Sequence, residues 1–165
     1  MLEIIRAAES DIDAIVGLAN HSGLALWSRD DYAKAANSRD RLLLAARDNA
    51  VNFVGFILVQ LLCSSGDAVD VEILNIAVDP RVKRKGIGRR LLVAALEMVP
   101  TGPESKVLLE VRASNHSAIA FYRRYGFQEQ AVRQAYYRDP TEDAILFGAD
   151  ADWVRSRLNC VQSDR

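Results

Sequence analysis

The chain has 165 residues, of which 50% are hydrophobic and 26% are charged, and this is the composition of a globular domain rather than of a disordered segment. Its 21 Lys and Arg residues nearly balance its 22 Asp and Glu residues, leaving a net charge of -1. This balance excludes the overall basic surplus that is typical of a general nucleic-acid-binding protein.

The N-terminus lacks the basic head and long apolar run of a secretory signal. The longest apolar run, 53–63, is interrupted by Gly55 and Gln60 and is too short to cross a bilayer. We therefore expect a cytoplasmic protein without a membrane partner, a monomer or weak dimer. We expect one domain over 1–150, followed by a tail over 151–165.

The cysteines and histidines do not form a recognisable site. Cys63 and Cys160 lie far apart without metal-ligand spacing, so we expect reduced thiols and no metal. His21 and His116 have no Ser, Cys or metal-ligand partner at motif spacing, and we expect both at the surface.

The N-terminal half of the chain carries the pattern of one strand, two helices and three further strands. Ile12, Ile15, Val16 and Ala19 recur at the spacing of an amphipathic helix. Short polar segments separate the later apolar runs and predict hairpin turns. The predicted elements are a strand over 2–7, helices from 9 or 10 and over 30–37, strands over 42–47, 52–63 and 69–78, and turns at 48–50 and 64–67.

The C-terminal half alternates helices and strands after Asp79-Pro80 ends the previous strand. The side chains of Ile87, Leu91, Ala95 and Met98 share one helical face. The expected elements are a helix over 86–99, a strand over 107–111 buried on both faces, a helix from a cap at 114–115 to 125, strands over 127–138 and 142–147, and a short helix or frayed end over 151–165. Together they predict an α/β (α+β) fold with a mixed, mostly antiparallel sheet of about seven strands and about four helices.

A basic, glycine-containing loop joins the strand that ends at Val78 to the helix that begins near Gly86. The range 81–90 holds six basic residues and no acidic one. Amide groups at a helix N-terminus bind phosphate, and a cluster of cations there opposes the helix dipole unless an anion neutralises it. The loop therefore predicts a phosphate site, although a solvated basic helix start is the alternative. Leu91 replaces the third glycine of a dinucleotide fingerprint, and the Gly-Lys-Ser/Thr of a P-loop is absent.

Glu110 and Tyr122 are the candidates for acid and base chemistry. Glu110 interrupts an apolar strand, and carboxylates are rarely buried without a partner. It is either a functional carboxylate or the ion-pair partner of Arg112. Tyr122 is either a functional hydroxyl or a core residue beside Ile119 and Tyr125.

The segment 76–92 resembles the acetyl-coenzyme A signature of the GNAT acyltransferase superfamily, Gln/Arg-x-x-Gly-x-Gly/Ala, with Lys83 at its first position. The chain from 71 to 147 is similar to the bacterial ribosomal-protein-alanine N-acetyltransferases (RimI-like). Upstream, Trp27 and Ser28 resemble the family's Pro-Trp-Ser, with Leu26 in place of the proline. The segments that carry the similarity are 74–80, 109–115, 118–122, 125–127, 133–137 and 142–145.

The resemblance implies the GNAT fold and transfer of acetyl from acetyl-CoA, without a metal, to the N-terminal alanine of a small-subunit ribosomal protein. It implies that Glu110 is the general base and Tyr122 the general acid. Glu72, on the strand that precedes the basic loop, is our second candidate for the base. The residues expected to bind the coenzyme are Ile76, Ala77, Val78, Arg84, Lys85, Gly86, Ile87, Gly88, Arg89 and Asn115. The residues expected to contact the acceptor are Trp27, Glu72, Tyr136 and Tyr137, and the alternative for Tyr136 and Tyr137 is an ordinary place in a sheet.

Three other functions stay open. The first is a GNAT enzyme that acts on a small amine, a free amino acid or a lysine side chain. The second is a coenzyme A-binding regulator without catalysis. The third is an RNA-binding module that uses the basic range 81–90, although the overall charge balance argues against direct nucleic-acid binding.

Overall fold

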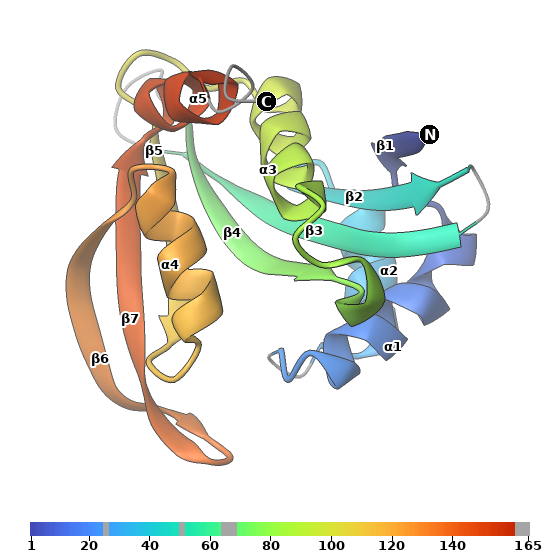
Figure 1. The fold of residues 1–165 in the computed structure, drawn as a ribbon, viewed down its shortest axis with the longest axis horizontal. Helices are drawn as coiled ribbons and strands as arrows, with labels where there is room; N and C mark the ends of the chain where they lie inside the picture. The colour runs from blue at the N-terminus through green and yellow to red at the C-terminus, as the bar shows by residue number, and fades with distance from the viewer. Residues whose placement is uncertain (25–26, 50–51, 64–68, 161–165) are drawn as a thin grey trace. The chain divides into compact units, whose positions relative to one another are not determined.

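The computed structural model describes residues 1–24, 27–49, 52–63 and 69–160 (Figure 1). These residues contain seven strands, five α-helices and two short 3-10 helices. The chain divides into two compact units, Met1–Leu61 with Ile73–Val99 and Leu62–Glu72 with Pro100–Arg165. In chain order the elements are β1 (Leu2–Arg6), η1 (Glu9–Asp11), α1 (Ile12–His21), α2 (Arg29–Ala36), β2 (Arg41–Asp48), β3 (Asn52–Cys63), β4 (Val69–Val78), η2 (Pro80–Val82), α3 (Ile87–Met98), β5 (Lys106–Arg112), α4 (His116–Arg124), β6 (Gln128–Arg138), β7 (Thr141–Asp150) and α5 (Ala151–Cys160).

The first unit is a sheet with helices on both faces. Its strands follow the order β1-β2-β3-β4, and the pairs β1–β2 and β2–β3 are antiparallel. Side chains along β2 alternate between the two faces, so Leu43 and Ala45 join a core with α1 and α2. Leu42 and Leu44 face the other side of the sheet and are equally buried. Both faces are therefore apolar, which explains the nearly continuous hydrophobic run of β2.

Gly55 allows β3 and β4 to approach each other closely within this unit. A Cβ atom at Gly55 would lie 2.7 Å from the carbonyl oxygen of Ala77 and 3.4 Å from Cδ1 of Leu91. No real side chain fits at the first of these distances without a shift of the backbone. The glycine in the middle of an apolar strand thus has a packing reason.

The second unit holds three strands in the order β5-β7-β6, with antiparallel pairs β5–β7 and β6–β7. Val107, Leu109 and Val111 of β5 are buried. Leu109 lies opposite Phe147, whose ring centroid is 6.3 Å from that of Tyr122 on α4. This face of the sheet is therefore the core of the unit, and the alternate residues of β5 point to the other face.

The predicted elements agree with the structure in type and differ in detail. Met98 was expected on the buried face of its helix but is 45% exposed, because it is the last residue of α3. The strand 107–111 was expected to be buried on both faces, and this is wrong because Leu108 and Glu110 are only partly covered. The C-terminal segment forms the helix α5, and β7 extends to Asp150. The turn predicted at 64–67, and Ala50 of the other turn, lie outside the described residues.

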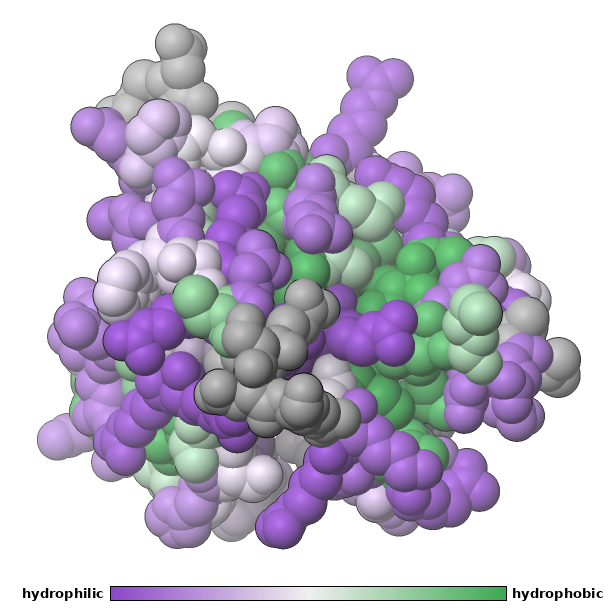
Figure 2. All heavy atoms as spheres, turned by 45° about the horizontal axis from the view of Figure 1, so that its top comes forward, coloured by the Kyte–Doolittle hydropathy of each residue, from purple (hydrophilic) through white to green (hydrophobic). Residues whose placement is uncertain are grey.

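The hydrophobic residues are mostly inside and the visible surface is mostly hydrophilic, with some green apolar area between the purple side chains (Figure 2). No helix in the described part of the chain is long and apolar enough to cross a membrane.

Candidate active site

The predicted phosphate loop lies in the first unit, between the end of β4 and the start of α3. Arg84 and Gly86 have left-handed backbone conformations, with φ of 64° and 75°. A left-handed residue next to other turn conformations can direct backbone amide groups toward one concave surface that binds anions. Gly86 provides no side-chain cap for α3, and the first turn of α3 carries no acidic residue. The start of this helix is thus suited to an anion rather than to an internal carboxylate.

At least three of the six basic residues of this loop, Arg81, Arg89 and Arg90, are engaged within the protein. Arg81 pairs with Asp79 at 2.6 Å, and its hydrogen bonds lower the pKa of that carboxyl to about 2. Arg90 donates to the carbonyl oxygen of Leu2 at 3.0 Å. Three others, Lys83, Arg84 and Lys85, are exposed at the surface. The positive charge available to a ligand is therefore smaller than the sequence indicates.

Trp27 is half-buried and packs against the core of the first unit. Its ring centroid lies 5.5 Å from that of Tyr32, and the guanidinium of Arg41 lies 5.3 Å above it. Tyr32 is fully buried, which raises its pKa to about 12, and its hydroxyl accepts from the Asn75 amide at 3.4 Å. These contacts give Trp27 a packing role, and its contact with an acceptor stays a prediction.

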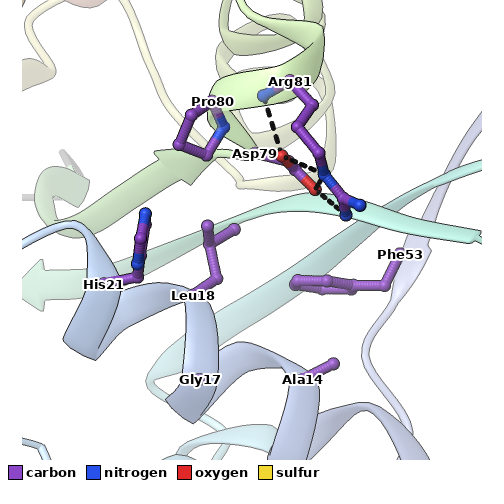
Figure 3. Close-up of a pocket in the computed structure, with 8 residues that line it drawn as sticks. All are labelled: Ala14, Gly17, Leu18, His21, Phe53, Asp79, Pro80 and Arg81. Carbon is purple, nitrogen blue, oxygen red and sulfur yellow. Dashed lines mark hydrogen bonds and ion pairs between the residues drawn. The ribbon is translucent and has the colours of Figure 1, made fainter.

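The first unit also contains an open pocket of about 480 Å³ that the sequence did not reveal (Figure 3). One wall comes from α1 and the other from Phe53 and the connection that follows β4. None of the predicted site residues lines it. The lining residues are Ala14, Gly17, Leu18, His21, Phe53, Asp79, Pro80 and Arg81.

Glu110 lies on β5 in the second unit, on the face opposite the core. Its side chain is 19% exposed, and its Oε1 lies 3.2 Å from Nε of Arg133 on β6. The alternative pairing with Arg112 is wrong, because Arg112 pairs with Glu142 at 3.2 Å. The strand register explains this, since Arg112 and Arg133 both lie opposite Ala144 and flank the middle strand β7. Sequence reasoning missed Arg133 because its strand order was unknown.

Glu72 lies close enough to Glu110 for their charges to interact. Burial raises the pKa of Glu72, the charge of Glu110 raises it further, and Arg133 lowers it. Among the described residues, no hydrogen bond or ion pair satisfies the Glu72 carboxylate. A half-buried carboxylate without such a partner is suited to bind a cation.

Tyr136 and Tyr137 stand around the same carboxylate. The interaction of the Tyr136 hydroxyl with the Glu110 carboxylate is the main reason that the Tyr136 pKa is raised. The Arg112 guanidinium lies 4.0 Å over the Tyr137 ring, whose hydroxyl has a raised pKa chiefly because of burial. Tyr136 is 47% exposed, so this aromatic side chain is accessible to solvent. The structure thus brings together Glu72, Glu110, Tyr136 and Tyr137.

Tyr122 is buried on α4 within an aromatic cluster. Its ring packs against those of Phe121, Phe127 and Phe147. The core packing that was the alternative for this residue is therefore observed. Burial and the neighbouring Tyr137 raise the Tyr122 pKa, so the hydroxyl holds its proton more firmly than an exposed phenol. Its role as general acid stays a prediction.

Several smaller expectations have clear outcomes. The Asn115 side chain accepts from the Ala118 amide at 3.2 Å, which confirms it as the N-cap of α4. His21 and His116 are exposed, as expected. Cys160 has a free, exposed thiol. Within the described ranges, no group of three or more His, Cys, Asp or Glu residues is placed to hold a metal ion.

Sequence comparison and structure comparison both match this chain to N-acetyltransferases. The model of the acetyltransferase (GNAT) family matches residues 10–127. The [ribosomal protein bS18]-alanine N-acetyltransferase of Escherichia coli K12 is 32% identical over 139 residues, which cover 83% of this chain and 89% of the relative. The crystal structure of the E. coli ribosomal-protein-S18-alanine N-acetyltransferase superposes with a TM-score of 0.77 at 29% identity, over 92% of this chain and 94% of the other.

A more distant structure shares the fold. Arabidopsis thaliana Naa50, solved with the bisubstrate analogue CoA-Ac-MVNAL, has a TM-score of 0.77 at 23% identity, over 90% of this chain and 98% of the other. The predicted fold class and the prediction of an N-acetyltransferase are confirmed by these matches. The chain belongs to the acetyltransferase (GNAT) family.

Proposed function

We propose that this enzyme transfers acetyl from acetyl-CoA to the α-amine of a protein N-terminus that begins with alanine. The observation that carries the proposal is the pair Glu72 and Glu110, two carboxylates on one accessible face beside Tyr136. Such a face favours a cationic amine over a neutral or anionic acceptor. The naming of the E. coli relative for the alanine of ribosomal protein bS18 supports an α-amine.

Acetyl-CoA supplies an activated acetyl group, and the first unit supplies the groups proposed to bind it. The α3 N-terminus with Gly86, Ile87 and Gly88 is suited to the pyrophosphate, assisted by the range 84–89. The backbone of 76–78 at the end of β4 is proposed to donate to the thioester carbonyl and the pantetheine amides. Donors so placed stabilise the oxyanion as it develops. Asn115 is proposed as a further coenzyme contact.

The proposed reaction uses Glu110 and Tyr122 in sequence. The acceptor ammonium gives one proton to the Glu110 carboxylate, directly or through water, and its nitrogen forms a bond to the thioester carbon. The carbon–sulfur bond then breaks, and the Tyr122 hydroxyl gives its proton to the departing thiolate. The nitrogen loses its second proton as the amide forms, and this proton restores the Tyr122 hydroxyl through water, while Glu110 later releases the first proton to solvent. Because burial raises the Tyr122 pKa, the hydroxyl carries its proton when the acceptor binds.

An α-amine is easier for Glu110 to deprotonate than a lysine amine. With a pKa near 8, roughly a tenth of an N-terminal amine is neutral at pH 7, whereas a lysine near pKa 10.4 is neutral well below one part in a thousand. A single carboxylate is sufficient for the first and poorly matched to the second. The proposal therefore favours protein N-termini over lysine side chains.

We further propose that the natural acceptor is the N-terminal segment of a small-subunit ribosomal protein, acetylated in the cytoplasm by a monomer or weak dimer. Trp27, Glu72, Tyr136 and Tyr137 are the proposed acceptor contacts. Residues 1–150 are proposed as the catalytic domain, with 151–165 as its tail.

Intact-mass detection of acetylation tests the acceptor. The substrates are peptides that begin with Ala, Ser or Met, and a peptide with a blocked N-terminus and an internal Lys. We expect transfer to the Ala peptide first. Transfer only to the blocked Lys peptide would contradict the α-amine assignment, and acetyl-CoA binding without turnover on any amine would favour a regulator.

Two conservative variants test the proposed catalytic pair. Glu110→Gln and Tyr122→Phe should each lower kcat by about 10²-fold or more, which is the contribution of a positioned acid or base. Gln128→Ala, exposed on β6 and away from these two residues, is the control and should retain activity. Unchanged turnover in a variant removes that residue from the mechanism.

A further inference from the structure

The hairpin of β6 and β7 is irregular opposite Asp143. Arg133 pairs with Ala144, and Tyr137 pairs with Glu142. Three residues of β6, 134–136, therefore lie opposite the single residue Asp143. This is a β-bulge, and such bulges often redirect side chains next to active sites.

The bulge decides which side chains reach Glu110. In a regular strand, Arg133 and Tyr136 would point to opposite faces because their separation is odd. Here Arg133 forms the ion pair with Glu110, and the same Arg133 guanidinium lies 5.4 Å from the centroid of the Tyr136 ring. The Tyr136 and Tyr137 rings, also adjacent in sequence, are 5.2 Å apart. Without the bulge these side chains would not share one face.

The bulge needs a residue in an unfavourable backbone conformation. Ala135 has a φ of 49°, in the left-handed region that residues with a Cβ atom rarely occupy. A non-glycine residue remains in such a conformation only where the surrounding structure holds it.

Asp143 holds Ala135 in this left-handed conformation. Its Oδ1 accepts from the Ala135 amide at 2.8 Å, across the hairpin. Its own carbonyl oxygen accepts from the amide of Ala113 at 3.1 Å, just after β5. Asp143 thus ties the bulge to the middle strand and the middle strand to the end of the strand that carries Glu110.

We propose that Asp143 is a positioning residue for the acceptor side of the site, acting through Ala135 to place Arg133 and Tyr136 against Glu110. This inference rests on the proposed function for the role of Glu110. The contact between Asp143 and Ala135 can be tested without it.

The first test is kinetic. Asp143→Ala should lower kcat/KM for an Ala-initiated peptide by about tenfold, the effect of one lost hydrogen bond, and leave KM for acetyl-CoA unchanged. Asp143→Asn keeps an acceptor oxygen and should stay within about threefold of the original enzyme. Asp139→Ala, which removes a carboxylate elsewhere on the same hairpin, is the matched control and should have no effect.

The second test is rescue. Glycine adopts positive φ without a steric cost, so adding Ala135→Gly to Asp143→Ala should restore part of the lost peptide kcat/KM. A general structural role of Asp143 would not be relieved at this one position. Equal losses in the Asp143→Ala and Asp143→Asn variants, with no rescue by glycine, would overturn the proposal.

The third test uses hydrogen exchange of the Ala135 amide, read by NMR. In the unaltered enzyme this amide should exchange at least about tenfold more slowly than an unbonded amide, and Asp143→Ala should remove the protection. A freely exchanging Ala135 amide in the unaltered enzyme overturns the proposal even if Asp143→Ala does not fold. Full activity of Glu110→Gln would instead refute the proposed base, while the exchange result still decides the Asp143 contact.

Discussion

The Nε atom of Arg133 lies 3.2 Å from Oε1 of Glu110, and the same guanidinium lowers the pKa of Glu72. One cation on β6 therefore compensates two carboxylates that would otherwise repel each other. A protonated acceptor amine carries the same charge and is chemically suited to take over part of this role when it binds.

Replacing Arg133 should change the pH dependence of the enzyme. In Arg133→Gln, Glu72 loses the charge that lowers its pKa, so its ionised fraction falls at acidic pH. The acid limb of the pH profile of kcat/KM for an Ala peptide should move to higher pH. Above that limb, kcat/KM should change by less than about fivefold, as expected for a partly exposed ion pair. Arg138→Gln, exposed on the same strand, is the control. An acid limb that stays in place would contradict the coupling.

Glu72 should lower the stability of the folded protein at neutral pH. Its pKa is raised in the folded state, so unfolding becomes relatively easier as pH rises above the ordinary value for glutamate. Glu72→Gln should therefore increase Tm at pH 7, and the increase should disappear near pH 3, where the carboxyl is protonated in both states. The gain is small because the side chain is only half-buried. A lower Tm at pH 7 would refute this.

Arg84 offers a positive charge to the proposed coenzyme and has a strained backbone conformation. Arg84→Gln and Arg84→Gly should both raise KM for acetyl-CoA by about three- to tenfold, less so at high salt, because each removes one charge near the bound phosphates. The glycine variant should be the more stable of the two by about 1 kcal/mol, since φ is 64° at this position. Arg39→Gln, exposed elsewhere in the first unit, should leave KM unchanged.

Gly55→Ala should damage the first unit. The new Cβ would lie 2.7 Å from the Ala77 carbonyl oxygen, so β4 must shift, and a loss of about 1–3 kcal/mol is expected from denaturant unfolding. KM for acetyl-CoA should rise as well, because Ala77 belongs to the segment proposed to bind it. Gly17→Ala is the opposite case, with nothing within 4 Å and a helical position, and it should be neutral or stabilising by up to about 1 kcal/mol.

Asp11 is a structural carboxylate that the sequence did not single out. Its side chain is 4% exposed, pairs with Arg47 at 2.5 Å and accepts from the Ala8 amide at 2.8 Å. Asp11→Ala should cost about 2 kcal/mol in the free energy of unfolding, because it leaves Arg47 without its partner. Asp13→Ala removes an exposed carboxylate two residues away and should cost less than about 1 kcal/mol.

The local elements were predictable because their signals lie within short stretches of chain. Asn115 and Gly126 mark the two ends of α4 as expected, and Gly126 has the left-handed φ of 90° that a helix end uses. The predicted helix and strand boundaries lie close to the observed ones for the same reason. Met98 was misplaced because the helical period does not show where burial stops at the end of a helix.

The partners of the charged residues were not predictable from spacing. Arg112 is two positions from Glu110 and on the same face, yet it pairs with Glu142, which also accepts from the Ser114 amide at 2.5 Å. Arg133 reaches Glu110 only because β7 lies between their two strands. The bulge at Ala135 is equally invisible in a sequence that offers no glycine there.

The sequence alone determined the family, the order of the elements and the residue types of the site, including the basic loop and Glu110. These are properties of residues that are near one another in the chain. The tertiary structure decided which cations remain available at the loop, which side chains gather on Glu110, and that Asp143 holds the bulge in place. Those outcomes depend on strand order and register, which bring together residues that are far apart in sequence.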